Sequence, residues 1–239
     1  MKRFLVCVVS GVMVLACQSV WAAGASYYAS CGDLPEVDDP ATWEFIDNGQ
    51  STFYAEMVGT APNSILHGVA LDPDWRAMIW RDTAPPDSIA NLVCEMSAQV
   101  LDNCGSYDTW GGFGFYVRGA DAYNVNVMLD EDRVLLMSSG QTLQTYMMDT
   151  TDMYHTYRLE VVDYSAEVYV DGVSRLTLSL GSDSSSAYCY FGTNGWEGSE
   201  FNVEYIWYET TSAVVPEPST ALLCLGAAVL FAAIRRRRG

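Results

Sequence analysis

The stretch that decides the fold runs from Thr156 to Leu180 and reads TYRLEVVDYSAEVYVDGVSRLTLSL. Apolar and polar side chains alternate over residues 156–161, which is the period of a strand with one buried face. A turn follows near Asp163. The later pair Asp171-Gly172 favours a two-residue type I′ turn, because both positions of that turn must accept a positive φ. This stretch therefore predicts consecutive antiparallel strands.

Short runs rich in β-branched and aromatic residues occur along most of the chain, separated by Gly, Asp, Asn and Ser clusters. They lack the helical period, and several such runs in sequence predict an all-β sandwich of antiparallel sheets packed face to face. The other expected strands cover residues 65–71, 77–81, 92–100, 112–118, 123–129, 133–138, 186–192 and 201–208.

The chain begins with a predicted signal peptide and helix over residues 1–22. Two basic residues precede an apolar run over residues 4–17, and small residues follow, as in a secretory signal. We expect signal peptidase to cut after Ala22. A cut after Ala25, a lipoprotein cut before Cys17 and a retained membrane helix are the alternatives.

The C-terminal tail has three parts. The tripeptide Pro216, Glu217, Pro218 precedes a hydrophobic segment, for which we predict a transmembrane helix over residues 219–234. Four arginines follow this helix: Arg235, Arg236, Arg237 and Arg238. They should stay on the cytoplasmic side of the membrane and leave the preceding domain outside.

This arrangement resembles the PEP-CTERM sorting signal of Gram-negative bacteria that make extracellular polysaccharide. The resemblance implies cleavage near residues 216–218 by an exosortase, a membrane cysteine peptidase. We therefore expect an inner-membrane precursor that is held by its C-terminal helix and later becomes a cell-surface or secreted protein. An ordinary tail anchor is the alternative.

The predicted domain covers residues 23–208, followed by a linker over 209–215 and the sorting signal over 216–239. Between residues 23 and 213 the chain has 29 acidic and six basic side chains, a net charge of about −23. A field of that sign repels nucleic acid, which excludes nucleic-acid binding. We expect no required cofactor; Ca²⁺ is the candidate metal, because it prefers carboxylate and carbonyl ligands.

Four cysteines lie in the domain, namely Cys31, Cys94, Cys104 and Cys189. An even number in an exported domain favours disulfides, with three possible connectivities. Cys94 with Cys104 would close a short loop, and Cys31 with Cys189 would be the remaining pair. Zinc is not expected, because no Cys-x-x-Cys spacing occurs.

A second resemblance covers the chain from Leu92 onward. The segments Tyr154–Glu160 and Ala166–Val173 resemble the paired strands of concanavalin A-like and laminin G-like domains, and Tyr190–Gly192 and Val203–Tyr208 occupy the expected later positions. The resemblance implies a jelly-roll sandwich with a concave face. Related domains often bind glycans and sometimes calcium, and in them His155 and Arg158 would be structural.

Catalytic motifs are not apparent. Glycoside hydrolases need two carboxylates that flank the scissile bond, and laminarinase-type enzymes place them as Glu-x-Asp-x-x-Glu on one strand, which is not found here. Glu204 and Glu209 would point to opposite faces of a regular strand, and Asp130-Glu131-Asp132 reads as a solvated turn. We therefore predict a non-enzymatic protein, with a glycan hydrolase of the same fold as the alternative.

Binding is the predicted function of the domain. Sugar rings stack on exposed aromatic side chains, and the candidate residues beside Gly- and Asp-rich turns are Trp110, Tyr123 and Trp196. Trp43, Trp80 and Trp207 are expected in the core. We predict a non-catalytic surface or matrix protein that binds polysaccharide, and a purely structural surface protein is a further alternative.

Overall fold

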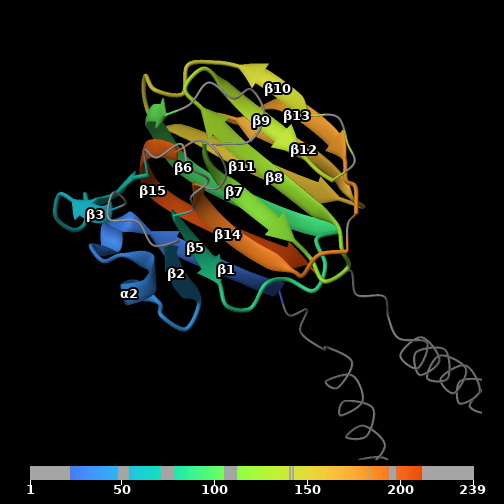
Figure 1. The fold of residues 1–239 in the computed structure, drawn as a ribbon, viewed down its shortest axis with the longest axis horizontal. Coiled ribbons are helices and arrows are strands. Elements are labelled where there is room, and N and C mark those ends of the chain that lie inside the picture. Colours follow the sequence, from blue (N-terminus) through green and yellow to red (C-terminus); the bar gives the residue numbers. More distant parts are fainter. Residues whose placement is uncertain are drawn as a thin grey trace, which may run out of the picture. The chain divides into compact units, whose positions relative to one another are not determined.

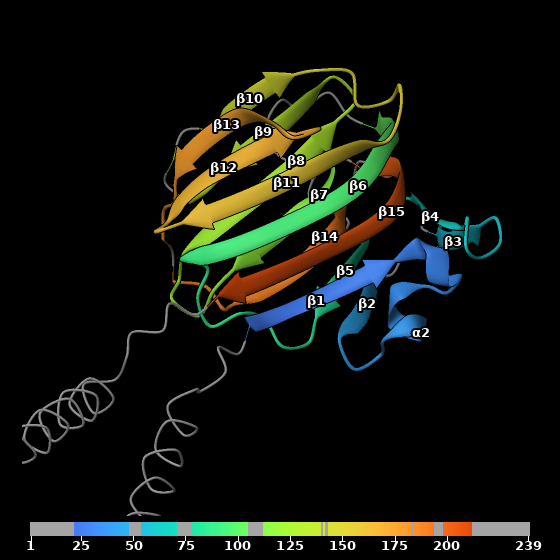
Figure 2. The same ribbon diagram turned by 180° about the vertical axis from the view of Figure 1, so that it is seen from behind.

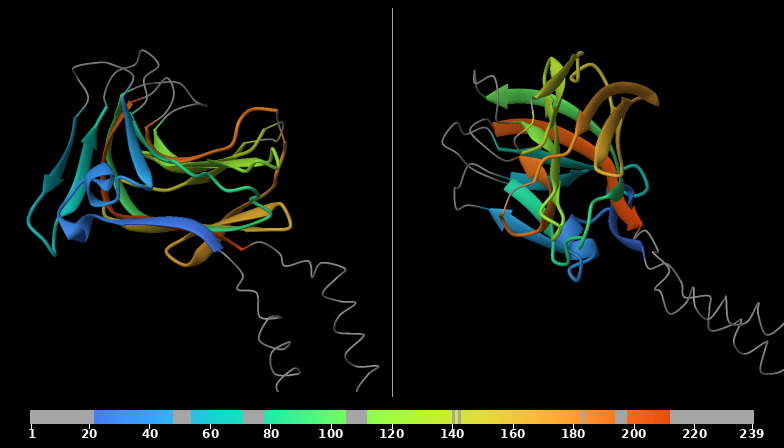
Figure 3. Two further views of the ribbon diagram at one scale, coloured as in Figure 1. Left: turned by 90° about the horizontal axis from the view of Figure 1, so that it is seen from below. Right: turned by 90° about the vertical axis from the view of Figure 1, so that its right-hand side faces the viewer.

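The computed structural model describes residues 22–47, 54–70, 78–104, 112–139, 141, 143–182, 184–193 and 198–211. These residues form two antiparallel sheets, A and B, that pack face to face (Figure 3). The predicted all-β jelly-roll sandwich is confirmed. The predicted signal and tail helices lie outside the described residues, and among those residues no helix is long and apolar enough to cross a membrane.

Sheet A has the strand order β13-β12-β11-β6-β15-β4-β3, and β1 pairs with β15 (Figure 2). Its strands are β1 (Ala22–Tyr28), β3 (Tyr54–Val58), β4 (Ile65–Val69), β6 (Asn91–Cys104), β11 (His155–Val162), β12 (Ser165–Val170), β13 (Val173–Ser179) and β15 (Gly198–Thr211).

Sheet B has the order β10-β9-β8-β7-β14-β5-β2 and faces the viewer in Figure 1. Its strands are β2 (Trp43–Asp47), β5 (Met78–Asp82), β7 (Phe113–Arg118), β8 (Asn124–Asp130), β9 (Arg133–Met137), β10 (Gln144–Met147) and β14 (Tyr188–Thr193). A single 3-10 turn, η1 (Ala29–Cys31), and a short helix, α2 (Pro35–Asp38), follow β1.

The turns between β11, β12 and β13 follow the sequence prediction. Asp171 has a φ of 50° and Gly172 a φ of 77°, as a type I′ turn requires. Asp163 and Tyr164 also have positive φ values, of 48° and 60°, at the preceding hairpin. These tight turns fix the register of the three strands.

Four strands were not expected from the sequence: β1, β2, β3 and β10. β1 reads AAGASYY, which has few β-branched or aromatic residues, and it forms by pairing with β15 from Ala22↔Thr211 to Tyr28↔Tyr205. β15 itself continues to Thr211, beyond the expected strand end at Tyr208. Pairing with a strand that is distant in sequence therefore stabilises β1, whose own residues have little strand propensity.

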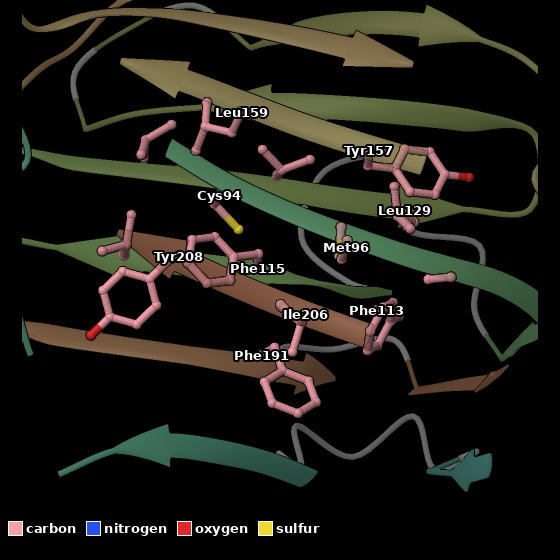
Figure 4. Close-up of a cluster of buried hydrophobic side chains, with 14 of the residues drawn as sticks. Cys94, Met96, Phe113, Phe115, Leu129, Tyr157, Leu159, Phe191, Ile206 and Tyr208 are labelled. Atoms are coloured by element: carbon pink, nitrogen blue, oxygen red, sulfur yellow. The ribbon is translucent and has the colours of Figure 1, made fainter. Parts of the chain in front are cut away.

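The core lies between the sheets and is strongly aromatic (Figure 4). Phe191 on β14 lies 5.3 Å from the Trp43 ring and 5.2 Å from the Trp80 ring, measured between centroids. These two tryptophans are buried, as predicted. The prediction for Trp207 was wrong, because its position in β15 turns it to the outer face of sheet A, where it is half-buried.

The predicted disulfides are not formed among the described side chains. Cys94 and Cys189 are free thiols in the core, and Cys31 is a free thiol at the surface. Cys31 and Cys189 therefore do not pair, and Cys94 does not use its thiol to close a loop with Cys104, whose side chain lies outside the described set. Both buried thiols fill space as small apolar groups.

Substitution of Gly68 tests the packing of the two sheets. A Cβ at this position would lie 2.3 Å from the Cζ of Phe201, whose ring stacks on Phe113 at 4.2 Å. We expect Gly68→Ala to lower the free energy of unfolding by about 1–3 kcal/mol, because the ring must move out of a packed site. Urea unfolding measures this loss. Adding Phe201→Leu should recover part of it, and full stability of the single variant would contradict the packing.

Thiol labelling tests the cysteine assignment. With iodoacetamide and peptide mapping, we expect Cys31 to react in the folded protein. Cys94 and Cys189 should react only after unfolding, because burial shields them and raises the pKa of both thiols. Recovery of Cys31 as a disulfide, or equally fast labelling of Cys94 and Cys31, would show that the assignment is wrong.

Candidate functional site

The outer face of sheet B is the candidate site. In β7, β8 and β14 every second side chain points into the core, so the residues between them share the opposite face. This face is unusual because its central side chains are also largely shielded from solvent. We call the following set the tyrosine strip: Tyr116, Arg118, Asn126, Met128, Leu135, Tyr188 and Tyr190.

Three tyrosine rings form the centre of the strip. Tyr190 stacks on Tyr116 with centroids 4.8 Å apart, and its ring lies 5.2 Å from that of Tyr188. The guanidinium carbon of Arg118 lies 5.4 Å from the centre of the Tyr188 ring. Tyr188 and Tyr190 are half-buried, whereas Tyr116 and Arg118 are buried beneath them. The strip thus offers two rings that reach solvent on a rigid support.

Tyr116, a residue 3% exposed, and Asn126, a residue 8% exposed, each hold a buried polar atom without a hydrogen-bond partner among the described residues. These atoms are the Tyr116 hydroxyl and Asn126 Oδ1. Burial raises the pKa of the Tyr116 hydroxyl, so this group stays neutral and can both donate and accept. Buried polar atoms normally have partners, and these two are closed off from solvent beneath the outer rings, so they suit a bound water that links them to a ligand on the strip.

The carboxylates on this face are held by arginines. Arg133 donates from Nε and Nη2 to Asp130 at 2.8 Å and 2.7 Å. Arg81 donates to Glu44 at 2.6 Å on the far edge of the sheet. Arg133 Nε also lies 3.6 Å from Asp132 Oδ1, so one guanidinium compensates both the Asp130 and the Asp132 carboxylates. The 130–132 cluster is a turn, as predicted, with Arg133 as its counter-ion.

Glu160, Glu167, Glu204 and Glu209 lie on strands of sheet A. Glu160 and Glu167 are directly opposite each other in the β11–β12 ladder. A register shift between Val203 and Tyr205 breaks the alternation of β15, and Glu204 and Glu209 are both exposed. The expectation that these last two point to opposite faces assumed a regular strand.

The predicted ligand residues do not form the strip. Trp110 and Trp196 lie outside the described residues. Tyr123 is half-buried, and its ring stacks on Tyr164 with centroids 3.9 Å apart, against the core. Sequence reasoning missed Tyr188 and Tyr190, although their spacing about a buried cysteine in a strand is a signal for two rings on one face.

His155 serves the fold. Its Nδ1 lies 2.7 Å from Asp171 and its Nε2 lies 2.9 Å from Asp152, so the ring joins the β12–β13 turn to the loop before β11. Burial disfavours the imidazolium, but hydrogen bonds and charges of the two carboxylates outweigh this effect and raise its pKa. In the described residues, no group of three or more His, Cys, Asp or Glu side chains is arranged to hold a metal ion. The calcium hypothesis stays a prediction.

Comparison with known proteins gives two results. Residues 214–238 match the PEP-CTERM protein-sorting motif, so the chain carries this exosortase-type signal and is an exported protein. Among curated proteins no sequence matches the chain. The resemblance of the tail is confirmed.

Solved structures share the fold of the domain. The cellulose-induced protein Cip1 matches with a TM-score of 0.56 at 10% identity, over 77% of this chain and 96% of that one. The apo Crh5 transglycosylase matches with a TM-score of 0.54 at 12% identity, over 81% of this chain and 87% of that one. The laminarinase catalytic domain from Thermotoga maritima MSB8 matches with a TM-score of 0.51 at 11% identity, over 82% of this chain and 98% of that one. The domain therefore has the same β-sandwich fold as these structures.

The prediction of a non-enzymatic protein is contradicted by these neighbours, because a transglycosylase and a laminarinase catalytic domain share the fold. That prediction rested on missing linear motifs. A β-sandwich assembles its site from side chains on several strands, so a single-strand motif is a narrow criterion.

The His155 bridge predicts how stability depends on pH. A raised pKa in the folded state means that the bridge stabilises fully below the unfolded value of roughly 6.5, and that this gain is lost as pH rises through the folded value. We expect His155→Gln to lower the unfolding midpoint more at pH 5.5 than at pH 8.5. The facing groups are Asp152 and Asp171, with Arg175 acting on Asp171. An equal loss at both pH values would refute the bridge.

Proposed function

We propose that the protein is an exported, surface-sorted protein that binds and processes an extracellular glycan along the tyrosine strip. The sorting motif supports delivery outside the cytoplasm. The β-sandwich fold supports glycan chemistry, because two of the structures that share it carry the names of glycan-processing enzymes. The strip supplies the site.

The observation that carries this proposal is the combination of rings and unpartnered polar atoms in one strip. Tyr190 and Tyr188 offer amphipathic rings, on which the apolar face of a sugar can stack. The Oδ1 atom of Asn126 accepts hydrogen bonds, and the Tyr116 hydroxyl both donates and accepts them. Sugar hydroxyls provide the matching groups. Binding sites are commonly apolar surfaces with a few placed polar groups, as here.

The proposal assigns no carboxylate pair to the reaction, so the reaction type has to be identified from its products. Asp130 is the carboxylate nearest in sequence to Asn126 on this face, and Arg133 compensates its charge. The three outward positions of β7 are Gly114, Tyr116 and Arg118, none of which can act as a carboxylate. Product analysis that detects hydrolysis and glycosyl transfer alike therefore tests the proposal.

We propose that the signal peptide is cleaved after Ala22, because this site preserves most of β1. It would leave Ala23–Tyr28 paired with β15, whereas a cut after Ala25 would remove half of β1. The mature protein would then begin within a strand of sheet A.

The test uses the exported protein and a panel of β-glucans, xylans and chitin oligosaccharides. We expect binding of at least one glycan and new oligosaccharide products, detected by mass spectrometry and by new reducing ends. Tyr190→Ala should weaken binding by about tenfold, since a lost stacking contact is worth about 1 kcal/mol or slightly more. Tyr54→Ala is the control, because Tyr54 is a half-exposed ring on β3 of sheet A.

Two results would contradict the proposal. One is an absence of binding and of products across the panel. The other is a Tyr190→Ala protein that behaves like Tyr54→Ala, which would place the glycan elsewhere. Binding that is lost in Tyr190→Ala but never accompanied by products would disprove processing.

A further inference from the structure

A second surface with a different chemistry lies on the outer face of sheet A, over β1, β15, β6 and β11 (Figure 2). Strand pairing puts its side chains in two adjacent rows. Trp207 stands between Ser26 and Glu95 in one row. Tyr205 stands between Tyr28 and Ser97 in the other row. We call this surface the acidic platform.

The rings of the platform are accessible and fixed. Tyr28 is 50% exposed, and its ring lies 5.9 Å from that of Tyr205 at an interplanar angle of 33°. The Tyr205 hydroxyl donates to Glu95 at 3.1 Å. Arg158 donates to Glu95 at 3.3 Å and to Glu160 at 2.7 Å. These contacts hold the central carboxylates in place on the outer face of sheet A.

The charge of the platform is strongly negative. Its acidic side chains are Glu95, Glu160, Glu204 and Glu209, and Glu167 on the neighbouring strand β12 lies opposite Glu160. Arg158 is the basic side chain among them, and Ser97 donates to Glu204 at 2.6 Å. The whole domain carries a net charge of about −23, which extends the same field.

The negative charge and the accessible rings of the acidic platform favour a cationic ligand. Anionic glycans, nucleic acids and anionic lipids are repelled by such a field, whereas cations are drawn to it. Ammonium groups bind over the faces of Tyr and Trp rings and beside carboxylates. Tyr205 and Trp207 are two residues apart on β15, so their positions repeat at about 7 Å along the strand. A polymer with an amine and a sugar face in each unit can use rings and carboxylates together.

We propose that the acidic platform binds a polysaccharide that carries protonated amino groups. The sugar faces lie on Tyr28 and Trp207, and the ammonium groups lie beside Glu95, Glu204 and Glu209. The platform is on the opposite sheet from the tyrosine strip. One molecule could thus hold a cationic matrix polymer on one face while the other face is engaged.

The test measures binding of the full exported protein to immobilised chitosan oligosaccharide, with fully N-acetylated chitin oligosaccharide of the same length for comparison. We expect preference for the amine form and weaker binding as salt is raised. Tyr28→Ala should weaken binding two- to fivefold or more, the value of one lost stacking contact between a sugar face and an exposed ring. Tyr28→Phe should retain it.

Matched variants separate a site from simple charge attraction. Tyr28→Ala and Tyr54→Ala remove rings that are equally exposed, and neither changes the net charge. Equal binding by the two variants would overturn the proposal, because only non-specific attraction would then remain. The comparison is repeated in Tyr190→Ala, in which glycan binding by the tyrosine strip is weakened. Equal binding of the chitin and chitosan oligosaccharides by Tyr190→Ala, or a preference for oligolysine, would also overturn the proposal.

Discussion

The long pairing of β6 with β15 is the constraint on which the rest of the structure depends. It runs from Gly198↔Cys104 to Thr210↔Leu92 and forms the centre of sheet A. Ile206 and Tyr208 on β15 point into the core, where Tyr208 donates its hydroxyl to the buried Asp82 of β5. The same strand presents Trp207 outward. β15 therefore contacts sheet B through the core and also contributes Trp207 to the outer face of sheet A.

Burial on both faces distinguishes sheet B from sheet A. In β7 and β8 every described side chain is buried, including the outward set that forms the tyrosine strip. Parallel sheets usually show such two-sided burial, whereas an antiparallel sheet with one solvated face alternates. The two-sided burial of sheet B gives it the shielded, partly polar character of a binding site. Sheet A keeps the alternating pattern and an open, charged surface.

Much of the fold could be predicted from the sequence because strong local signals occur where the strands are most regular. The alternation over residues 156–161 and the Asp171-Gly172 turn give β11 to β13. β1 and β3 could not be found, since their residues have weak strand propensity and form strands by pairing with β15 and β4. The register shift near Val203 also leaves no signal in the composition of β15.

The candidate site was harder to predict than the fold. A search for exposed aromatic side chains beside turns selected Tyr123, whose ring is used for packing on Tyr164. The tyrosine strip instead lies in the middle of strands, where ring positions depend on which strands become neighbours: β14 lies beside β7 although more than 60 residues separate them. Such a juxtaposition follows from sheet order and not from any local motif.

The most direct measurement of the central claim is a crystal structure of the exported protein soaked with an oligosaccharide that it binds. The proposed function predicts a sugar ring stacked on Tyr190, with a hydroxyl near Asn126 Oδ1 and the Tyr116 hydroxyl. A glycan bound only to the outer face of sheet A, with the tyrosine strip vacant, would contradict the assignment of the site.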